Sequence, residues 1–432
     1  MPEKFDVAVV GGGPAGLAAA YVMGQAGLNV IVLERGEYPG AKNVSGAVLY
    51  SQATNAVFPE FWQEAPLERP LVEQNLWITT EDAVVKMGYR NRTFNEEPYN
   101  NFSVLRAKFD RWMGKKVEEI GVVLVCETTV EDLLMKDNRV IGVKTGRPEG
   151  EVLANVVVLA EGCNSILTQE KLGFKKRHAW DQLAVAVKEI IALPKEKIED
   201  RFGLEPGQGA TIELVGWNTK NMIGTGFIYT NKESLSVGVG ALMSQMIDRK
   251  VNPNDLLEHM KSHPAVKPLI EGGELKEYEA KLIPEGGYHA VPRLYGDGVV
   301  IVGDAAMLVN GLHREGANLA MTSGKVAAEV IVEAHKAGDY SAGFLKKYHE
   351  RLNDTFVLKD LHKYRNANQF FDHNPQFFQT YPEMLSRAAK EFLTVDSIPK
   401  KEKQRKIYRL VKEMRSPIQI GKDMLGFWRT LG

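Results

Sequence analysis

The sequence predicts an α/β fold, with a mainly parallel sheet and flanking helices, an inserted antiparallel sheet, and a helical C-terminal region. Three observations predict this class. Short β-branched runs, typical of buried parallel strands, recur at 5–10, 152–160 and 299–303. Shorter β-like runs separated by glycines and polar turns fill 183–240, which is typical of an antiparallel sheet. From Ala342 onward the pattern is mostly helical.

The N-terminal stretch reads as strand, turn, helix and strand. Phe5–Val10 is the first strand, Leu17–Gly27 is a helix rich in small residues, and Asn29–Leu33 is the second strand. The turn carries a G-x-G-x-x-G motif formed by Gly11, Gly13 and Gly16. In such a motif the first glycine makes a tight turn, the second lets a pyrophosphate approach the backbone, and the third lets helix and strand pack closely.

This stretch predicts a dinucleotide site. The helix N-terminus offers N–H groups and partial positive charge to phosphate, and Glu34, at the end of the second strand, can accept hydrogen bonds from a ribose. The predicted contacts are Gly11, Gly13, Pro14, Ala15, Gly16, Glu34 and Arg35. On its own the stretch leaves both NAD and FAD open.

Composition narrows the class of protein. A formal net charge of −1 gives no reason to expect nucleic acid. The two cysteines, Cys126 and Cys163, exclude a disulfide framework and an iron–sulfur cluster held by this chain alone. No apolar run approaches the ~18 residues of a membrane span, and the N-terminus has no signal-peptide layout. We therefore expect a cytoplasmic protein without a metal site that can still lie on a membrane surface.

The elements between the first and second buried strands are mixed. Glu37–Tyr50 is rich in Gly, Pro, Asn and Ser and predicts a loop, whereas Leu76–Met87 and Arg90–Phe94 alternate loosely like antiparallel strands. Leu105–Ile120 has helical spacing of its apolar residues. The strand Val122–Cys126 and the β-meander Thr129–Arg147 follow.

The later predicted elements come before and after the third buried strand in the sequence. Asn254–Leu269 predicts a helix with a break at His263–Pro264, and Gly316–Lys336 predicts a helix after the strand Val299–Gly303. The second and third buried strands end in Glu161–Gly162 and Gly303–Asp304. Ligands bind outside the carboxyl ends of such strands, and three ends spread over the chain favour one extended ligand, FAD, over NAD.

These strand ends resemble three fingerprints of FAD enzymes with the aromatic-hydroxylase, glutathione-reductase-like fold. They are GGGPAG with Glu34, LAEGCNSIL at 159–167, and VVIVGDAA at 299–306. The resemblance implies a Rossmann-type FAD-binding domain in which Asp304 bonds the flavin ribityl chain and Arg106 flanks the adenosine. It also implies that the helix after Arg314, beginning near Glu315, Gly316, Ala317 and Asn318, points at the N1–C2=O edge of the flavin ring.

Three further segments resemble a narrower group. They are GAKNVSGAVL at 40–49, HPAVKPLIEGGE at 263–274 and YEAKLIPEGGYHAVP at 278–292, and they are similar to electron-transfer-flavoprotein:quinone oxidoreductases, most of all the FixC-like branch. This resemblance implies an FAD-containing subunit that passes electrons from an electron-transfer flavoprotein to menaquinone or ubiquinone in the membrane.

The partners follow from a difference within that family. The longer quinone oxidoreductases carry a cysteine-ligated cluster at their C-terminus, and this chain has no cysteine after Cys163. The FixC-like branch leaves the cluster to a ferredoxin-like subunit. The resemblance therefore implies a complex with that subunit and with the alpha and beta subunits of an electron-transfer flavoprotein. Such a complex can oxidise NADH by electron bifurcation, which would reside in the partner flavoprotein.

The expected catalytic segments are glycine-rich. Gly286 and Gly287 lie where the family holds a quinone carbonyl, and their bare N–H groups can stabilise the oxyanion that develops there, although a plain β-turn is the alternative. Ser45 and Gly46 lie where the chain would pass the flavin ring. His289 and His313 flank the expected flavin site and can relay protons, although a structural role is the alternative for each.

Two C-terminal segments suggest a surface role. Lys400–Arg415 is basic, and Ile407, Leu410, Val411 and Met414 share one helical face, the pattern of a helix on anionic lipid. Packing on its own protein or on a partner is the alternative. Phe370–Phe371 and Phe377–Phe378 form a second candidate patch. We expect a peripheral protein on the inner face of the cell membrane.

The sequence suggests three regions: an FAD-binding domain of residues 1–75, 100–175 and 290–345, a quinone domain of 76–99 and 176–289, and helical residues 346–432. Two other functions stay open. One is a stand-alone NAD(P)H-dependent flavin monooxygenase or geranylgeranyl-type reductase, and the other is a non-catalytic FAD-bound scaffold subunit.

Overall fold

The computed structural model describes residues 3–42 and 47–432. They form two compact units. The first takes in residues up to 68 together with 100–183 and 282–365, and the second takes in 69–99, 184–281 and 366–432. The divisions fall at 68/69, 99/100, 183/184, 281/282 and 365/366, where the sequence suggests 75/76, 99/100, 175/176, 289/290 and 345/346. The last helices, 366–432, group with the second unit instead of forming a third region.

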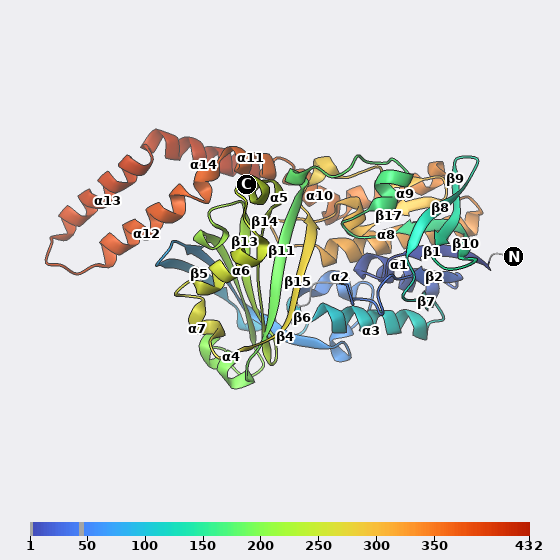
Figure 1. The fold of residues 1–432 in the computed structure, drawn as a ribbon, viewed down its shortest axis with the longest axis horizontal. Helices are drawn as coiled ribbons and strands as arrows, with labels where there is room; N and C mark the ends of the chain where they lie inside the picture. The colour runs from blue at the N-terminus through green and yellow to red at the C-terminus, as the bar shows by residue number, and fades with distance from the viewer. Residues whose placement is uncertain (1–2, 43–46) are drawn as a thin grey trace. The chain divides into compact units, whose positions relative to one another are not determined.

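The first unit is built on a sheet with a parallel centre (Figure 1). Its strand order is β16-β17-β10-β1-β2-β7, and β9 pairs antiparallel with β10 while β8 pairs with β9. The strands are β1 (Glu3–Val10), β2 (Val30–Leu33), β7 (Val123–Val125), β8 (Val130–Lys136), β9 (Arg139–Thr145), β10 (Glu151–Leu159), β16 (Tyr295–Gly296) and β17 (Val299–Ile301). Val7, Ala8 and Val9 have no exposed surface, as expected of a parallel strand covered on both faces.

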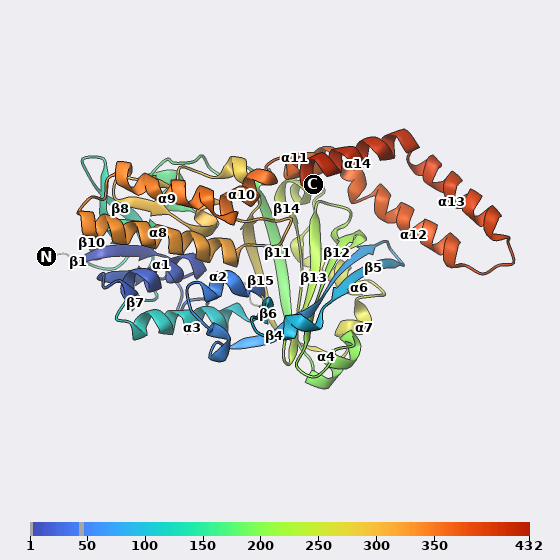
Figure 2. The same ribbon diagram turned by 180° about the vertical axis from the view of Figure 1, so that it is seen from behind.

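Helices flank this sheet, as the view from behind also shows (Figure 2). They are α1 (Pro14–Gln25), α2 (Ser51–Asn55), α3 (Arg106–Glu119), α8 (Ala317–Ala337), α9 (Ala342–Asp354) and α10 (Phe356–Lys363). α1 and α8 touch backbone to backbone, because a Cβ at Gly324 would lie 2.2 Å from the Ala15 carbonyl oxygen. This contact brings together the helices that follow β1 and β17.

The structure corrects two expectations. Residues 47–50 of the predicted loop form β3 (Ala47–Tyr50), because they pair antiparallel with β6 (Asn101–Val104). The strand predicted at Arg90–Phe94 is wrong: Arg92–Asn95 is a 3₁₀ turn, and the Asn91 side chain begins it by accepting the Thr93 N–H at 3.0 Å. Such local side-chain bonds compete with strand pairing.

The second unit is built on an antiparallel sheet, with one parallel pair. Its order is β15-β11-β14-β13-β12-β4, and β5 pairs with β4. The strands are β4 (Leu67–Thr79), β5 (Val84–Arg90), β11 (Leu183–Ala192), β12 (Gly209–Gly216), β13 (Gly224–Thr230), β14 (Ser234–Leu242) and β15 (Glu274–Pro284). The short helices are α4 (Lys195–Phe202), α5 (Met243–Asp248), α6 (Pro253–Ser262) and α7 (Lys267–Ile270).

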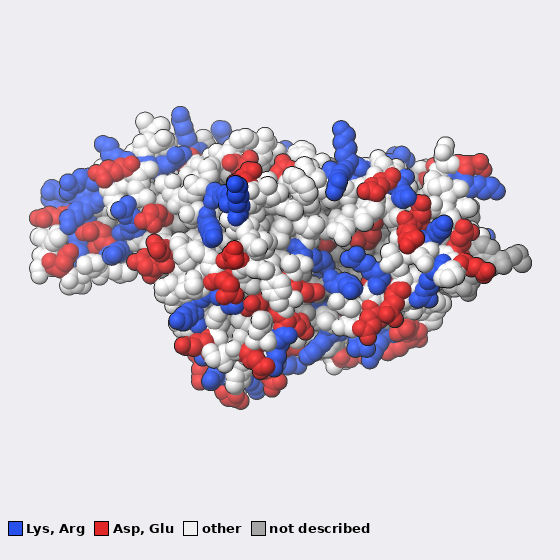
Figure 3. All heavy atoms as spheres, viewed as in Figure 1, with Lys and Arg blue, Asp and Glu red and all other residues white. Residues whose placement is uncertain are grey.

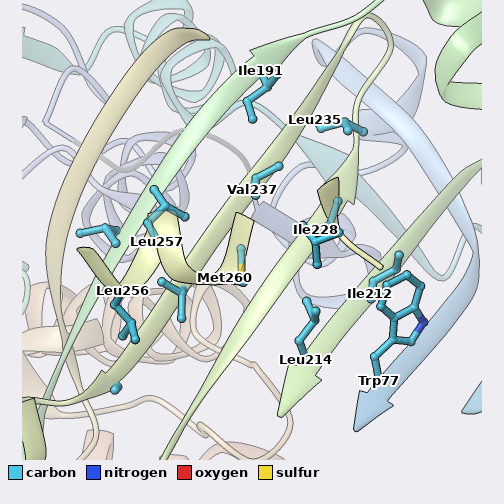
Figure 4. Close-up of a cluster of buried hydrophobic side chains, with 14 of the residues drawn as sticks. Trp77, Ile191, Ile212, Leu214, Ile228, Leu235, Val237, Leu256, Leu257 and Met260 are labelled. Carbon is cyan, nitrogen blue, oxygen red and sulfur yellow. The ribbon is translucent and has the colours of Figure 1, made fainter. Parts of the chain in front are cut away.

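One face of this sheet carries the core of the second unit. Leu256, Leu257 and Met260 of α6 lie beside Ile228 and Val237 of the strands, and all five are nearly or wholly buried (Figure 4). α6 and α7 are separate helices with the break at His263–Pro264 that the sequence predicts.

The C-terminal part of the second unit is helical. It contains α11 (Ala367–His373), α12 (Thr380–Leu393), α13 (Lys400–Met414) and α14 (Pro417–Leu431). α12 and α13 pack as a hairpin, and α11 packs on α14. No helix of the described part of the chain is both long and apolar enough to cross a bilayer.

Candidate cofactor site

The three strand ends that the sequence singles out are neighbours in one sheet. β10 lies between β1 and β17, and their last residues are in register: Val10 pairs with Leu159, and Leu159 with Ile301. Backbone bonds continue the alignment past the strands, from the Ala160 N–H to the Val10 carbonyl and from the Val302 N–H to the Leu159 carbonyl. Segments about 150 residues apart in sequence therefore open onto the same edge.

The three glycines of the N-terminal motif have different surroundings. Gly11 has φ +106°, and a Cβ there would lie 2.4 Å from the Ala160 carbonyl oxygen. A Cβ at Gly16 would lie 2.1 Å from the Gly11 carbonyl oxygen. A Cβ at Gly13 would meet nothing within 4 Å. Gly11 and Gly16 are thus required by the turn and its packing, whereas Gly13 leaves open space at the N-terminus of α1.

Glu34 braces this turn from the end of β2. It is 9% exposed, and its carboxylate accepts hydrogen bonds from the Gly12 N–H at 2.7 Å and the Gly36 N–H at 2.6 Å. A carboxylate oxygen has more than one lone pair, so a ribose contact stays compatible with these bonds. Arg35 is exposed beside it.

Two other predicted residues are engaged within the chain. The Glu161 carboxylate accepts the N–H groups of Leu167 and Thr168, each at 2.9 Å, and so caps the helical turn that follows. Arg106 forms a bidentate pair with Asp110, with two bonds of 2.8 Å, and Asp110 has no exposed surface. Gly162 has φ +74° with open space around its Cβ position.

Asp304 lies in the 3₁₀ turn that follows β17. The preceding Gly303 has φ +64°, its N–H donates to Ser323 Oγ of α8 at 3.0 Å, and a Cβ there would lie 2.8 Å from Ala15 Cβ. This turn therefore sits against the first turn of α1. Lys175 Nζ donates to the Ala305 carbonyl at 3.3 Å, and burial lowers the pKa of this lysine to about 8.

The N-terminus of α8 is also open. Asn310 and Glu315 exchange two backbone hydrogen bonds and so close a tight loop. The helix begins directly after this loop, at Gly316 and Ala317. The helix has neither a side-chain cap nor an acidic residue in its first turn. Asn318 is 6% exposed, and its Oδ1 has no hydrogen-bond partner.

These features fit FAD. The α1 N-terminus likewise has no side-chain cap and no acidic residue in its first turn, so two helix N-termini offer N–H groups and partial positive charge to one ligand. Gly13 leaves room for a pyrophosphate, and the unpartnered Asn318 Oδ1 requires a donor such as a ring N–H.

The Glu285–Gly287 turn combines a packed and an open glycine. A Cβ at Gly286 would lie 2.4 Å from Ala290 Cβ and 2.8 Å from Met307 Cε. Gly287 has φ +61° and ψ −160°, a conformation that essentially only glycine adopts, and open space surrounds its Cβ position. The Glu285 carboxyl lies against Gly311, and burial raises its pKa to about 7. Of the predicted pair, only Gly287 is open to a ligand.

The predicted histidines lie near the surface. His289 is exposed next to Tyr288, whose ring contacts His362 of α10 edge-on at 5.0 Å. His313 is exposed, and its Nε2 is 2.9 Å from the Tyr364 hydroxyl. Ser45 and Gly46 lie outside the described residues.

Some residues of this region have no signal in the sequence. Lys175, Tyr364 and Asn101 acquire their roles through contacts across long stretches of chain. Asn101 has no exposed surface, and neither atom of its side-chain amide has a hydrogen-bond partner, so it is a further candidate for a ligand contact. Only a pairing of Asn101 with β3, which the sequence does not predict, would have drawn attention to it.

Comparison with known proteins shows the family. The family described as FAD dependent oxidoreductase matches residues 6–174, and the ETF-QO/FixC family C-terminal domain matches residues 367–432. Protein FixC of Azotobacter vinelandii is 48% identical over 432 residues, all of both chains. Protein FixC of Escherichia coli K12 is 40% identical over 410 residues, 94% of each chain.

Solved structures share the fold at low identity. A geranylgeranyl bacteriochlorophyll reductase-like protein from Thermoplasma acidophilum has a TM-score of 0.73 at 19% identity, covering 97% of this chain and 98% of its own. The flavin-dependent brominase Bmp2 has a TM-score of 0.67 at 17% identity, covering 99% of each chain. With the sheet edge and its two open helix N-termini, these comparisons show that the chain belongs to the ETF-QO/FixC family and is an FAD-dependent oxidoreductase of electron transfer.

Proposed function

We propose that this chain passes electrons from an electron-transfer flavoprotein, directly or through a ferredoxin-like iron–sulfur subunit, to a membrane quinone. The observation that carries the proposal is the open Gly287 in its glycine-only conformation, within a chain that matches FixC proteins along its whole length. The proposal includes an electron-bifurcating, NADH-oxidising complex of these subunits, in which bifurcation takes place in the partner flavoprotein.

Bound FAD would supply an acceptor that takes electrons singly and releases two, as quinone reduction requires. The chain's own groups would hold it by the α1 N-terminus at the pyrophosphate and by the α8 N-terminus at the ring. The Gly287 N–H would donate to a quinone carbonyl oxygen, where negative charge develops on reduction. His289 and His313 are exposed and would relay protons between solvent and the site.

A matched pair of glycine variants tests the quinone site. Gly287→Ala should lower the rate of quinone reduction by at least about tenfold while FAD stays bound, because the new side chain shifts the donor out of line. Gly207→Ala is the control, since Gly207 also has positive φ, of +82°, with open space around it, but lies in the second unit. An unchanged quinone rate in FAD-loaded Gly287→Ala protein would remove Gly287 from the site.

The electron donor is tested separately. Rapid mixing of FAD-loaded protein with NADPH should leave the flavin oxidised, whereas reduced electron-transfer flavoprotein should bleach it. Rapid bleaching by NADPH alone would favour a monooxygenase or a geranylgeranyl-type reductase. No quinone-dependent flavin reoxidation in the purified assembly would favour a scaffold subunit.

A further inference from the structure

In the α12–α13 hairpin, the apolar stripe of α13 packs against α12. Ile407, Leu410, Val411 and Met414 of α13 are only partly exposed, and α13 packs along α12. This apolar stripe is therefore engaged by the neighbouring helix, which is the alternative to a lipid surface that the sequence leaves open. Lys and Arg side chains remain on the outside of the hairpin, which lies at the left of Figure 3.

A basic hollow of about 310 Å³ lies between the two helices. Its polar lining consists of Arg387 from α12 and Lys406, Arg409 and Glu413 from α13, and Leu410 and Met414 complete it. Two of its cations have carboxylates nearby at 3.6 Å, Glu383 for Arg387 and Glu391 for Lys406. Ion pairs this long at the surface are weak, so these cations can turn to an anion in the hollow.

The tip of the hairpin is apolar and exposed. Phe392 is 61% exposed, Leu393 73% and Val395 89%. Lys403 holds this tip in place: it is 2% exposed, its Nζ donates to the Glu391 and Thr394 carbonyls, and it pairs with Asp396 at 2.9 Å. Three large exposed apolar side chains, at the end of α12 and just after it, indicate a surface that is covered in use.

The distance between the basic hollow and the apolar tip fits a bilayer interface. Arg387 precedes Phe392 by five residues, which is about 8 Å along a helix. Apolar side chains of interfacial proteins reach about 5–10 Å into the boundary between headgroups and acyl chains. Cations set back by that distance would lie at the level of the phosphates.

We propose that the α12–α13 hairpin is a phospholipid-binding site. Arg387, Lys406 and Arg409 bind the phosphate of an anionic headgroup, and Phe392, Leu393 and Val395 insert beside it. The proposal rests on the proposed function in one respect, since a quinone acceptor resides in the bilayer. It adds a defined site at which the chain docks on the lipid.

Vesicle flotation tests the site with the full FAD-loaded chain. The probe is a vesicle of phosphatidylcholine with phosphatidylglycerol, compared with phosphatidylcholine alone. The triple variant Arg387→Gln, Lys406→Gln, Arg409→Gln should bind the mixed vesicles at least about tenfold more weakly, because three phosphate-binding charges are lost. The triple variant Phe392→Ser, Leu393→Ser, Val395→Ser leaves the hollow intact and should lose binding as well.

A control variant distinguishes binding at the hairpin from a general electrostatic attraction of the chain to anionic lipid. Lys195→Gln, Lys197→Gln, Lys336→Gln removes three exposed charges outside the hairpin and should bind like the unaltered chain. Equal loss in the control, binding unaffected by either hairpin variant, or displacement from the mixed vesicles by inorganic phosphate alone would each overturn the proposal.

Reduction of a short-chain, water-soluble quinone distinguishes the two proposals. The hairpin variants should reduce it at the unaltered rate and lose only the reduction of quinone held in vesicles. If the unaltered chain reduces neither quinone yet floats with mixed vesicles, the electron-transfer proposal fails while the lipid site stands.

Discussion

At the residue scale, the glycines of the first turn have two different roles. Gly11 and Gly16 are needed for folding, and Gly13 is needed for ligand binding. The sequence motif assigns each glycine a role, and the space around each position agrees with those roles: Gly11 and Gly16 press on backbone carbonyls, and Gly13 faces open space. The motif predicts these differences because the turn geometry is local. It could not predict that Glu34 would bind the turn through the Gly12 and Gly36 N–H groups, since this contact depends on the pairing of β2 beside β1.

Two alanine substitutions test this separation. Gly13→Ala should leave the free energy of unfolding nearly unchanged and weaken FAD binding at least about tenfold, because the methyl group occupies the approach of the pyrophosphate. Gly16→Ala should lower the free energy of unfolding by about 1–3 kcal/mol, because its Cβ overlaps the Gly11 carbonyl. The readouts are flavin absorbance per chain and chemical denaturation. Stable FAD-replete Gly13→Ala protein would count against a pyrophosphate at this turn.

The raised pKa of Glu285 should make the free energy of unfolding depend on pH. Burial raises its pKa to about 7, so the folded chain keeps a proton that the unfolded chain releases at lower pH. Stability should therefore fall as the pH rises from the usual carboxyl range to about 7, and the cost should persist above it. Glu285→Gln should add about 1–3 kcal/mol at pH 8 and little at pH 4, given about 1.4 kcal/mol per pKa unit.

Urea denaturation at both pH values measures this difference. The exposed Glu205→Gln is the control and should not change the pH profile. An equal effect of Glu285→Gln at pH 4 and pH 8 would contradict the raised pKa.

At the element scale, periodicity identified most strands and helices but not their partners. The α13 stripe of Ile407, Leu410, Val411 and Met414 has the same spacing whether it faces lipid or another helix, and only the fold shows that it faces α12. Likewise the phenyl rings of Phe370, Phe371 and Phe377 pack against one another, and those of Phe371 and Phe377 also contact Phe427 of α14, contacts that the sequence does not predict.

The C-terminal helices are joined by a polar anchor. Asp423 of α14 is 7% exposed and accepts two bonds from Arg415, of 2.6 and 2.8 Å, and one of 2.7 Å from the Tyr381 hydroxyl of α12. The hydrogen bonds from Arg415 hold the pKa of Asp423 below its usual value. No sequence pattern predicts this cluster, because its three side chains come from different elements.

Removal of that charge should loosen the C-terminal helices. Asp423→Asn should destabilise them by about 2–4 kcal/mol, since it leaves Arg415 without its partner. Limited proteolysis and chemical denaturation measure the loss, which should appear as earlier cleavage within 366–432. Asp372→Asn, at an exposed position of α11, is the control. Equal cleavage of both variants would show that the cluster contributes little.

At the scale of the whole molecule, the distribution of strand ends along the chain predicted the cofactor better than any single motif. β1, β10 and β17 end on one sheet edge in register, as the three glycine and acid signatures suggested. The prediction succeeded because parallel strands must align their carboxyl ends. The division into two units was harder, since the grouping of 366–432 with the antiparallel sheet depends on packing between distant segments.

Delivery of electrons to quinone is the proposed role of this FAD-dependent oxidoreductase. Its most direct test is anaerobic rapid mixing of the FAD-loaded chain, reduced beforehand, with a short-chain quinone. The flavin should reoxidise at a rate that rises with quinone concentration and that is at least about tenfold lower in Gly287→Ala protein, with Gly207→Ala unchanged. Flavin that stays reduced in the presence of quinone, and reoxidises only when oxygen is admitted, would contradict it.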